Sequence, residues 1–384
     1  MKYMGSKRAM LLNGLGALIR AEADQKERIV DLFSGAGAVS WFAAQSFAKP
    51  VVSVDLPGFG KVLARSVVER TNRLDPIQLE SDWLGSLNGK LGRSQTWETA
   101  YALDSARPNA GTWAKQARIL CSQTGGSGPT WRAYGGYYFA PSQACVLDVL
   151  RRALPPKGPA RWVCHAALLI AASKCVAAPG HTAQPFSTTR TAGPFLREAW
   201  LRDPLIYVRR ALRDLSIKFA RVRGEAKVGD AVRIARHLRE SDLVFVDPPY
   251  SGVHYSRFYH VLETLARGRC GPVTGTGRYP PPSERPKSLF SQKLGAPRAI
   301  EHLFRTLAKR GCTVIATFPA HQCSNGLSGA SVAQCAEQHF AIDRKVIKTR
   351  FSTLGGNGQN RSARMDSNEM MLLLKPRKSR ASSG

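Results

Sequence analysis

The stretch DLVFVDPPY, at residues 242–250, constrains the fold of this chain more than any other. Its four apolar residues lead directly into Asp247, and the run has the length and composition of a buried strand. Pro248 and Pro249 cannot donate to a strand ladder, so the strand is expected to end at Asp247. Because the residue before a proline favours extended geometry, the carboxylate and the neighbouring carbonyl groups are held stiffly. Open α/β sheets bind their ligands at this carboxyl edge, and Tyr250 adds a flat ring on which a base can stack.

A second informative unit lies near the N-terminus. Residues 26–34 (KERIVDLFS) predict a short buried strand, a glycine-containing turn and a helix follow, and residues 50–55 (PVVSVD) predict a second strand. Gly35 and Gly37 permit a tight turn and the close approach of a ligand to backbone N–H groups. Asp55, at the end of the second strand, is placed to accept hydrogen bonds from ribose hydroxyls. Since NAD and S-adenosylmethionine both carry adenosine, this unit does not distinguish them.

The middle of the chain breaks the strand–helix alternation. Only residues 162–178 stand out there as a helix, within a stretch rich in Trp, Gly, Arg and Pro. The alternation then resumes with an expected strand at residues 217–223. A Pro-rich, basic loop is expected at residues 272–298, and a strand pair near the C-terminus.

This pattern predicts an α/β fold with a Rossmann-like sheet and a long insertion. We assign residues 1–58 and 215–376 to the discontinuous core, residues 59–214 to the insertion, and residues 377–384 to a basic disordered tail.

The charge balance favours a polyanionic partner. The chain has 56 Lys and Arg residues against 27 Asp and Glu residues, a formal net charge of +29. Arg132, Arg151, Arg152, Arg190 and Arg197 of the insertion are candidates for phosphate contacts, although most such charges are ordinary solvated side chains.

Other sequence features bear on location and on metals. No pair of the eight cysteines has the CxxC spacing of zinc or thioredoxin-type sites. No apolar run reaches the roughly 18 residues of a membrane helix. We therefore expect a cytoplasmic protein that does not bind a membrane. His254 and His260 lack a neighbouring acid or thiol, so no metal site is expected.

Taken together, the motifs resemble those of the Dam-type, alpha-class DNA adenine-N(6) methyltransferases. DPPY at residues 247–250 is that family's catalytic motif unaltered. DLFSGAGAVS, at residues 31–40, resembles its cofactor motif, with Asp31 for the usual Glu. KYMGSK, at residues 2–7, resembles its opening motif, and residues 350–376 resemble its closing hairpin.

The resemblance implies an S-adenosylmethionine-dependent fold, with the insertion as target-recognition region. It also implies double-stranded DNA with a flipped target base as substrate, no metal, and a bacterial, phage or prophage setting in which a cognate restriction endonuclease is a possible partner. The implied catalytic residues are Asp247, Pro248, Pro249 and Tyr250. The implied cofactor-binding residues are Tyr3, Lys7, Asp31, Phe33, Gly35, Gly37, Asp55, Asp230 and Asp247.

Several alternatives stay open on the residues alone. The nearest is methylation of cytosine at N(4), since that chemistry needs the same acceptors. An NAD-dependent enzyme fits the glycine turn and Asp55 but has no use for DPPY. A catalytically inactive DNA-binding homologue fits the charge. Asp230 is explained equally well as the N-cap of a following helix.

Overall fold

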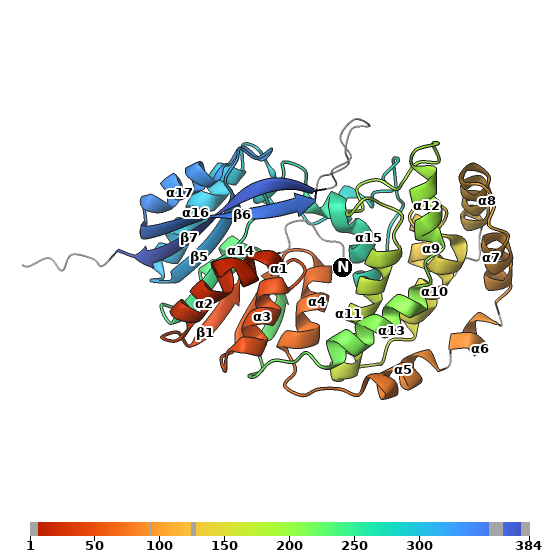
Figure 1. The fold of residues 1–384 in the computed structure, drawn as a ribbon, viewed down its shortest axis with the longest axis horizontal. Helices are drawn as coiled ribbons and strands as arrows, with labels where there is room; N and C mark the ends of the chain where they lie inside the picture. The colour runs from red at the N-terminus through yellow and green to blue at the C-terminus, as the bar shows by residue number, and fades with distance from the viewer. Residues whose placement is uncertain (1–6, 86, 93, 124–127, 353–363, 378–384) are drawn as a thin grey trace, which may run out of the picture.

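The fold is built on a seven-stranded sheet. A computed structural model describes residues 7–85, 87–92, 94–123, 128–352 and 364–377. The strand order is β3-β2-β1-β4-β5-β7-β6 (Figure 1). The first five strands are parallel, and β7 and β6 run antiparallel at one edge. The strand bounds are β1 Arg28–Asp31, β2 Val51–Asp55, β3 Glu225–Val228, β4 Asp242–Val246, β5 Thr313–Pro319, β6 Phe340–Ser352 and β7 Arg364–Pro376. This confirms the predicted Rossmann-like α/β fold.

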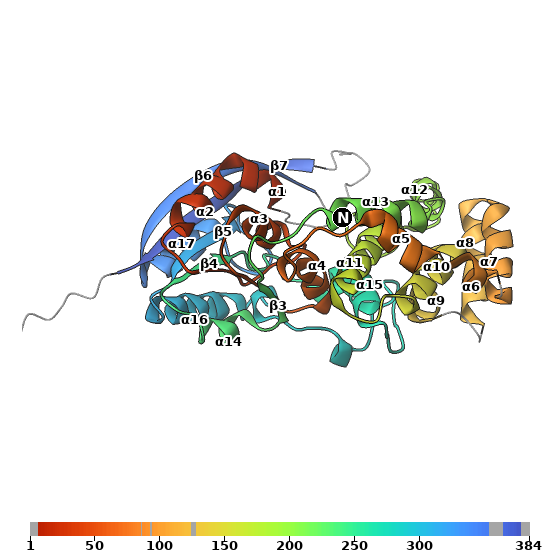
Figure 2. The same cartoon turned by 90° about the horizontal axis from the view of Figure 1, so that it is seen from below.

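Both faces of the parallel sheet are buried, because successive side chains of a strand point to opposite faces. In β4, Leu243 packs into the apolar cluster on one face, and Val244 packs into the cluster on the other. The first face is covered by α2 (Gly16–Ala23), α3 (Ala38–Ser46) and α4 (Gly58–Val68), and the second by α14 (Ala231–Ala235), α16 (Ala296–Lys309) and α17 (Gly329–Glu337). Figure 2 shows α3 and α4 on one side of the sheet and α14 and α16 on the other. Burial on both faces explains why the strands read as continuous apolar runs.

The segment between β2 and β3 is largely helical. After α4, which packs against β2 and β3, the chain forms nine further helices within the described residues. Their bounds are α5 Pro76–Leu84, α6 Leu87–Leu91, α7 Gln95–Ser105, α8 Ala110–Ser122, α9 Pro129–Tyr134, α10 Pro141–Arg152, α11 Gly158–Cys175, α12 Gly193–Trp200 and α13 Pro204–Ser216. The sequence predicted only α11, because apolar periodicity in the shorter helices is interrupted by Gly, Trp and Arg. The chain enters the sheet through α1 (Arg8–Met10) and a π-helical turn, Leu11–Leu15.

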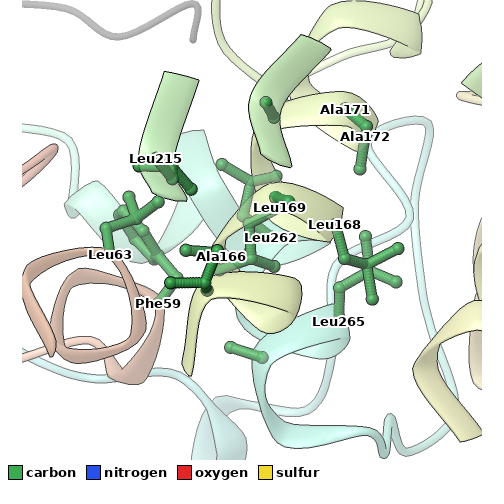
Figure 3. Close-up of a cluster of buried hydrophobic side chains, with 14 of the residues drawn as sticks. Phe59, Leu63, Ala166, Leu168, Leu169, Ala171, Ala172, Leu215, Leu262 and Leu265 are labelled. Carbon is green, nitrogen blue, oxygen red and sulfur yellow. The ribbon is translucent and has the colours of Figure 1, made fainter. Parts of the chain in front are cut away.

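One apolar cluster joins the inserted helices to the core. Figure 3 shows Ala166 and Leu169 of α11 among side chains from α4, α13 and α15 (Tyr255–Arg267). Phe59, Leu262 and Leu215, one from each of these helices, are at most 2% exposed. The inserted helices therefore pack directly on the helix layer of the sheet, with α11 at the centre of the contact.

The strand predicted at residues 217–223 is absent, and that prediction was wrong. Helix α13 runs to Ser216, and the strand begins at Glu225. The carbonyl groups of Leu215, Ser216 and Lys218 all accept hydrogen bonds from the buried Arg70 guanidinium. With these acceptors taken by a side chain, the segment completes a helix end rather than a ladder.

Other sequence expectations fare differently. The C-terminal strand pair is present as the antiparallel pair β6–β7. Residues 272–295 form no α-helix or strand, only an isolated bridge and two short 3₁₀ turns, Pro282–Glu284 and Leu289–Ser291. In the parts of the chain that the structure describes, no helix combines the length and apolar character needed to cross a membrane. Of the tail predicted at residues 377–384, Arg377 donates hydrogen bonds to the carbonyls of Phe340 and Glu337, and residues 378–384 lie outside the described residues.

Candidate active site

The candidate site is a pocket at the carboxyl edge of the sheet. Strands β1, β2 and β4 end there, with β1 between the other two, so residues far apart in sequence become neighbours. The empty space of the pocket, with the open solvent at its mouth included, is about 1010 Å³. The sequence-predicted residues that line it are Lys7, Asp31, Phe33, Gly35, Asp55, Asp230, Asp247, Pro248, Pro249 and Tyr250.

The glycine turn after β1 is tied to the end of β2. Gly35 and Gly37 have φ values of +50° and +80°, which favour glycine. The Gly35 N–H donates to Oδ2 of Asp55 at 2.5 Å, and the Leu56 N–H donates to Oδ1 at 2.8 Å. Burial raises the pKa of Asp55 to about 7, against the effect of these two hydrogen bonds. The turn and the acid thus form one unit beside the pocket.

Asp31 occupies the end of β1 and is 1% exposed. Its Oδ2 accepts a hydrogen bond from the Ser40 hydroxyl at 2.7 Å, and its Oδ1 accepts a longer one from the Phe33 N–H at 3.3 Å. Burial raises the pKa of Asp31 to about 7, more than the hydrogen bond from Ser40 lowers it. Asp31 is therefore a weakly solvated acid in the wall of the pocket, where it favours a cationic neighbour.

Asp247 belongs to a group of charges that the sheet brings together. The Lys7 ammonium lies 3.0 Å from Asp247 Oδ1 and 3.0 Å from Glu369 Oε2, and Lys7 is 4% exposed. Burial raises the pKa of Asp247 to about 6, although the Lys7 charge acts in the opposite direction. Burial disfavours the charged form of Lys7, but the two carboxylates outweigh it and the pKa of Lys7 is raised. Lys7 is thus a buried cation shared by two acids.

The proline corner is fixed from the neighbouring strand β5. The Thr317 hydroxyl donates to Asp247 Oδ1 at 3.0 Å. The side-chain amide of Asn325, fully buried, donates to the carbonyls of Pro249 at 2.9 Å and Phe290 at 3.0 Å. Both prolines and these hydrogen bonds restrain the corner, so Asp247 is presented to the pocket in one orientation.

The far wall of the pocket is largely aromatic. Tyr250 lines it together with His254 and Phe290, and Phe290 packs edge-on against Phe33 at 5.1 Å between ring centroids. Burial raises the pKa of Tyr250 to about 12 and lowers that of His254. His254 Nδ1 is buried without a hydrogen-bond partner among the described residues. The pocket therefore offers flat rings beside a small number of polar groups.

Three predicted residues need separate comment. Asp230 lines the pocket, and its side chain also accepts a hydrogen bond from the Arg233 N–H as the N-cap of α14, so both interpretations describe its position. Gly37 caps α3 and is not among the pocket-lining residues. Tyr3 lies outside the described residues.

Among the arginines considered for phosphate contacts, Arg151 donates hydrogen bonds to the carbonyls of Leu265 and Ala266. This makes Arg151 a structural contact.

Sequence reasoning missed Glu369, Thr317, Asn325 and Phe290. An acid that opens an apolar strand, as Glu369 does in NEMMLLL, was a usable signal. The other three carry no local pattern that separates them from ordinary core and loop residues. Within the described ranges, no group of three His, Cys, Asp or Glu side chains is arranged to hold a metal ion.

Comparison with known proteins gives two findings. Residues 201–272, which include β3, β4 and DPPY, match the model of the D12 class N6 adenine-specific DNA methyltransferases. The chain is also similar to "Modification methylase StsI" of Streptococcus sanguinis, with 24% identity over 274 residues. That match covers 70% of this chain but only 36% of the relative, so the chain spans about a third of the relative's length.

The matched segment carries the proline corner, and the sheet around it is Rossmann-like. The family match and the homologue support an adenine methyltransferase family, since residues 201–272 are similar to the D12 class N6 adenine-specific DNA methyltransferases.

Proposed function

We propose that the protein transfers a methyl group from S-adenosylmethionine to the exocyclic amino group (N6) of adenine at a specific DNA sequence. The observation that carries the proposal is the shared pocket: Asp247 and its two prolines lie in the same cavity as Gly35 and Asp55. A base-binding corner and an adenosine-binding turn are the two halves that such a transfer requires.

The residues of the pocket fit S-adenosylmethionine. Asp55 has carboxylate oxygens suited to ribose hydroxyls, and the Gly35 turn allows close approach of the ligand. Asp31 is a buried acid with a raised pKa, which a cationic amino group would stabilise in its charged form. The apolar rings of Phe33 and Phe290 provide a wall for an adenine ring. When bound, S-adenosylmethionine supplies a methyl group on a positively charged sulfur.

The chain's own residues prepare the amine. The adenine amino group is a poor nucleophile because its lone pair is conjugated with the ring. The Asp247 carboxylate and the Pro248 carbonyl accept hydrogen bonds from the two N–H groups of this amine. These hydrogen bonds favour a tetrahedral nitrogen and stabilise the positive charge that develops there. Lys7 and Thr317 hold Oδ1 of Asp247, so the carboxylate keeps its orientation. The rigidity of the corner supplies positioning, which the reaction needs most.

The target base must leave the duplex before it reaches Asp247. Flipping costs a few kcal/mol. Stacking on Tyr250 offsets part of this cost, at roughly 1–3 kcal/mol per base.

We further propose that the helices between β2 and β3 recognise the target sequence. We also propose that the protein works in the cytoplasm of a bacterial or phage-infected cell, and that a cognate endonuclease acts on the same site.

Nucleoside analysis of DNA treated with the protein and S-adenosylmethionine tests this function. We expect N6-methyladenine, and its loss in Asp247→Ala without loss of DNA binding. N4-methylcytosine would identify the cytosine alternative. A wild-type protein that binds DNA but transfers no methyl group would support the inactive DNA-binding homologue. Calorimetric binding of NAD in place of S-adenosylmethionine would support the NAD-dependent enzyme.

A further inference from the structure

A second, basic crevice lies beside the candidate active site. It is formed by α1, α3 and α4 on the side of the core and by α11 and α13 on the side of the inserted helices. Figure 1 shows these two groups of helices facing each other next to the carboxyl edge of the sheet. Ala36, in the turn after β1, lines both this crevice and the candidate site. The two cavities are therefore neighbours.

The polar lining of the crevice is mainly cationic. Arg8, Lys174 and Arg210 line it, together with the single acid Asp214. Asp214 already forms an ion pair with Lys218, so it does not neutralise the other three. Three positive charges thus converge on one hollow, in a chain whose formal net charge is +29. Such a concentration of charge draws a polyanion.

These cations differ from many others in the protein. Arg28, Arg202 and Arg209 form ion pairs with Asp242, Glu198 and Glu80, respectively. Arg8, Lys174 and Arg210 form no ion pair and donate no side-chain hydrogen bond to any residue that the structure describes. The Arg210 guanidinium lies 5.8 Å from the ring centroid of Tyr207, which limits its motion while leaving its N–H groups available.

The crevice has few polar groups besides its cations. Its indole, Trp41, already donates its N–H to the Leu63 carbonyl at 3.1 Å. The Leu63 and Ile170 side chains are apolar, so the remaining donors are the three cations and the Tyr207 hydroxyl. Lysine and arginine bind phosphate through their charge whatever the base sequence, and Asp214, the single acidic side chain of the lining, is already paired with Lys218.

We infer that this crevice holds the sugar-phosphate backbone of the DNA strand next to the flipped base. The inference rests on the proposed function, since it takes DNA as the substrate. It assigns Arg8, Lys174 and Arg210 to phosphate contacts that position the duplex against the core and the inserted helices together. Specific recognition then falls to other surfaces.

The test measures the affinity of the whole protein for two short fluorescein-labelled duplexes of different sequence, between about 50 and 200 mM NaCl. Lys174→Gln and Arg210→Gln each remove one charge from an exposed helical position. We expect each to weaken binding about three- to tenfold at low salt, equally for both sequences, and to reduce the salt slope by about 0.9. The double variant should reduce the slope by about twice that amount.

The matched control is Arg298→Gln, an equal charge change on α16, on the opposite face of the sheet. Unchanged slopes in the two crevice variants, or an equal loss in Arg298→Gln, would overturn the inference.

The outcomes separate the two proposals. If the wild-type protein methylates DNA while the crevice variants bind DNA like wild type, only the assignment of the crevice to the DNA backbone is refuted. Crevice-dependent DNA binding without methyl transfer by the wild type refutes the proposed reaction alone. Absence of DNA binding by the wild type refutes both.

Discussion

At the scale of single residues, the notable feature is a lysine shared by two carboxylates. Lys7 contacts Asp247, which directly follows β4, and Glu369, which lies in β7. Strand β5 lies between these two strands in the sheet. Lys7 is buried and the two carboxylates are mostly buried, so each charge strongly affects the protonation of the others. Lys7 lowers the pKa of Asp247, and Glu369 raises it.

This arrangement predicts a pH profile with opposite responses to two substitutions. In the proposed reaction Asp247 acts in its ionised form, so kcat/KM should fall as the pH drops through about 6, where burial places the pKa of Asp247. Glu369→Gln removes a negative charge, which should move the acidic limb to lower pH. Lys7→Met removes the compensating cation, which should move the limb to higher pH. Limbs that move in the same direction, or that do not move, would contradict the electrostatic account.

Asp31 provides a stability prediction whose sign follows from its burial. An Asp carboxyl has a pKa of about 3.9 in an unfolded chain, and burial raises the pKa of Asp31 to about 7 in the folded protein. The folded state therefore holds this proton more tightly, and stability is lost as the pH rises from about 4 to about 7. Asp31→Asn, which is neutral throughout, should raise the Tm of the ligand-free protein more at pH 8 than at pH 5.

The difference corresponds to a free energy on the order of 2 kcal/mol. Asp343→Asn, an exposed position on β6, is the control and should give no pH-dependent gain. A gain from Asp31→Asn that is equal at both pH values would show that the buried charge is not its cause.

At the scale of elements, the loop after β5 fixes the loop after β4. The side-chain NH₂ group of Asn325 donates hydrogen bonds to the carbonyls of Pro249 and Phe290. The Oδ1 atom of Asn325 accepts a hydrogen bond from the Leu327 N–H at 3.3 Å. Two parallel strands end side by side here, so a residue of one loop can restrain the other. The prolines stiffen the corner locally, and Asn325 fixes where the corner lies.

Asn325→Ala should therefore lower kcat with little change in the affinity for S-adenosylmethionine. A corner displaced by about 1 Å costs roughly 100-fold in rate, and we expect a loss on the order of tenfold to 100-fold in single-turnover methyl transfer. Ser324→Ala, which removes one exposed hydrogen bond to the Gly252 N–H, serves as the neighbouring control. Equal losses in the two variants would argue against a specific role of Asn325.

At the scale of the whole molecule, the inserted helices are joined to the core at both ends by one buried side chain. Arg70, 3% exposed, follows α4 and donates to the carbonyls of Ser66 and Asn72 beside it in sequence. It also donates to the carbonyls of Leu215, Ser216 and Lys218, where the chain returns to the sheet. One guanidinium therefore forms hydrogen bonds with both the segment that enters the insertion and the segment that leaves it.

Arg70→Met keeps the apolar stem but removes the guanidinium donor from five carbonyls, of which those of Leu215 and Ser216 keep a backbone donor. We expect the free energy of unfolding to fall by on the order of 3 kcal/mol, since each buried unpaired group costs about 1–3 kcal/mol. Hydrogen exchange should increase first around residues 213–220. Arg221→Met is the control, because Arg221 is exposed and its side chain makes a single hydrogen bond to the described part of the chain, at the Ser46 carbonyl. A global loss without local exchange at this junction would contradict the assigned role.

The sequence by itself determined the features whose causes are local. Two prolines after an apolar run end β4 at the sheet edge, and two glycines permit the turn beside Asp55, so the core and the predicted pocket residues were foreseeable. The tertiary structure alone decided which groups meet across long separations. Lys7 and Glu369 are 362 residues apart. Arg70 donates to the Lys218 carbonyl, which lies within the strand predicted at residues 217–223. The basic crevice exists only between two packed helix layers. Such contacts depend on how buried surfaces fit together, and no local periodicity or motif encodes that fit.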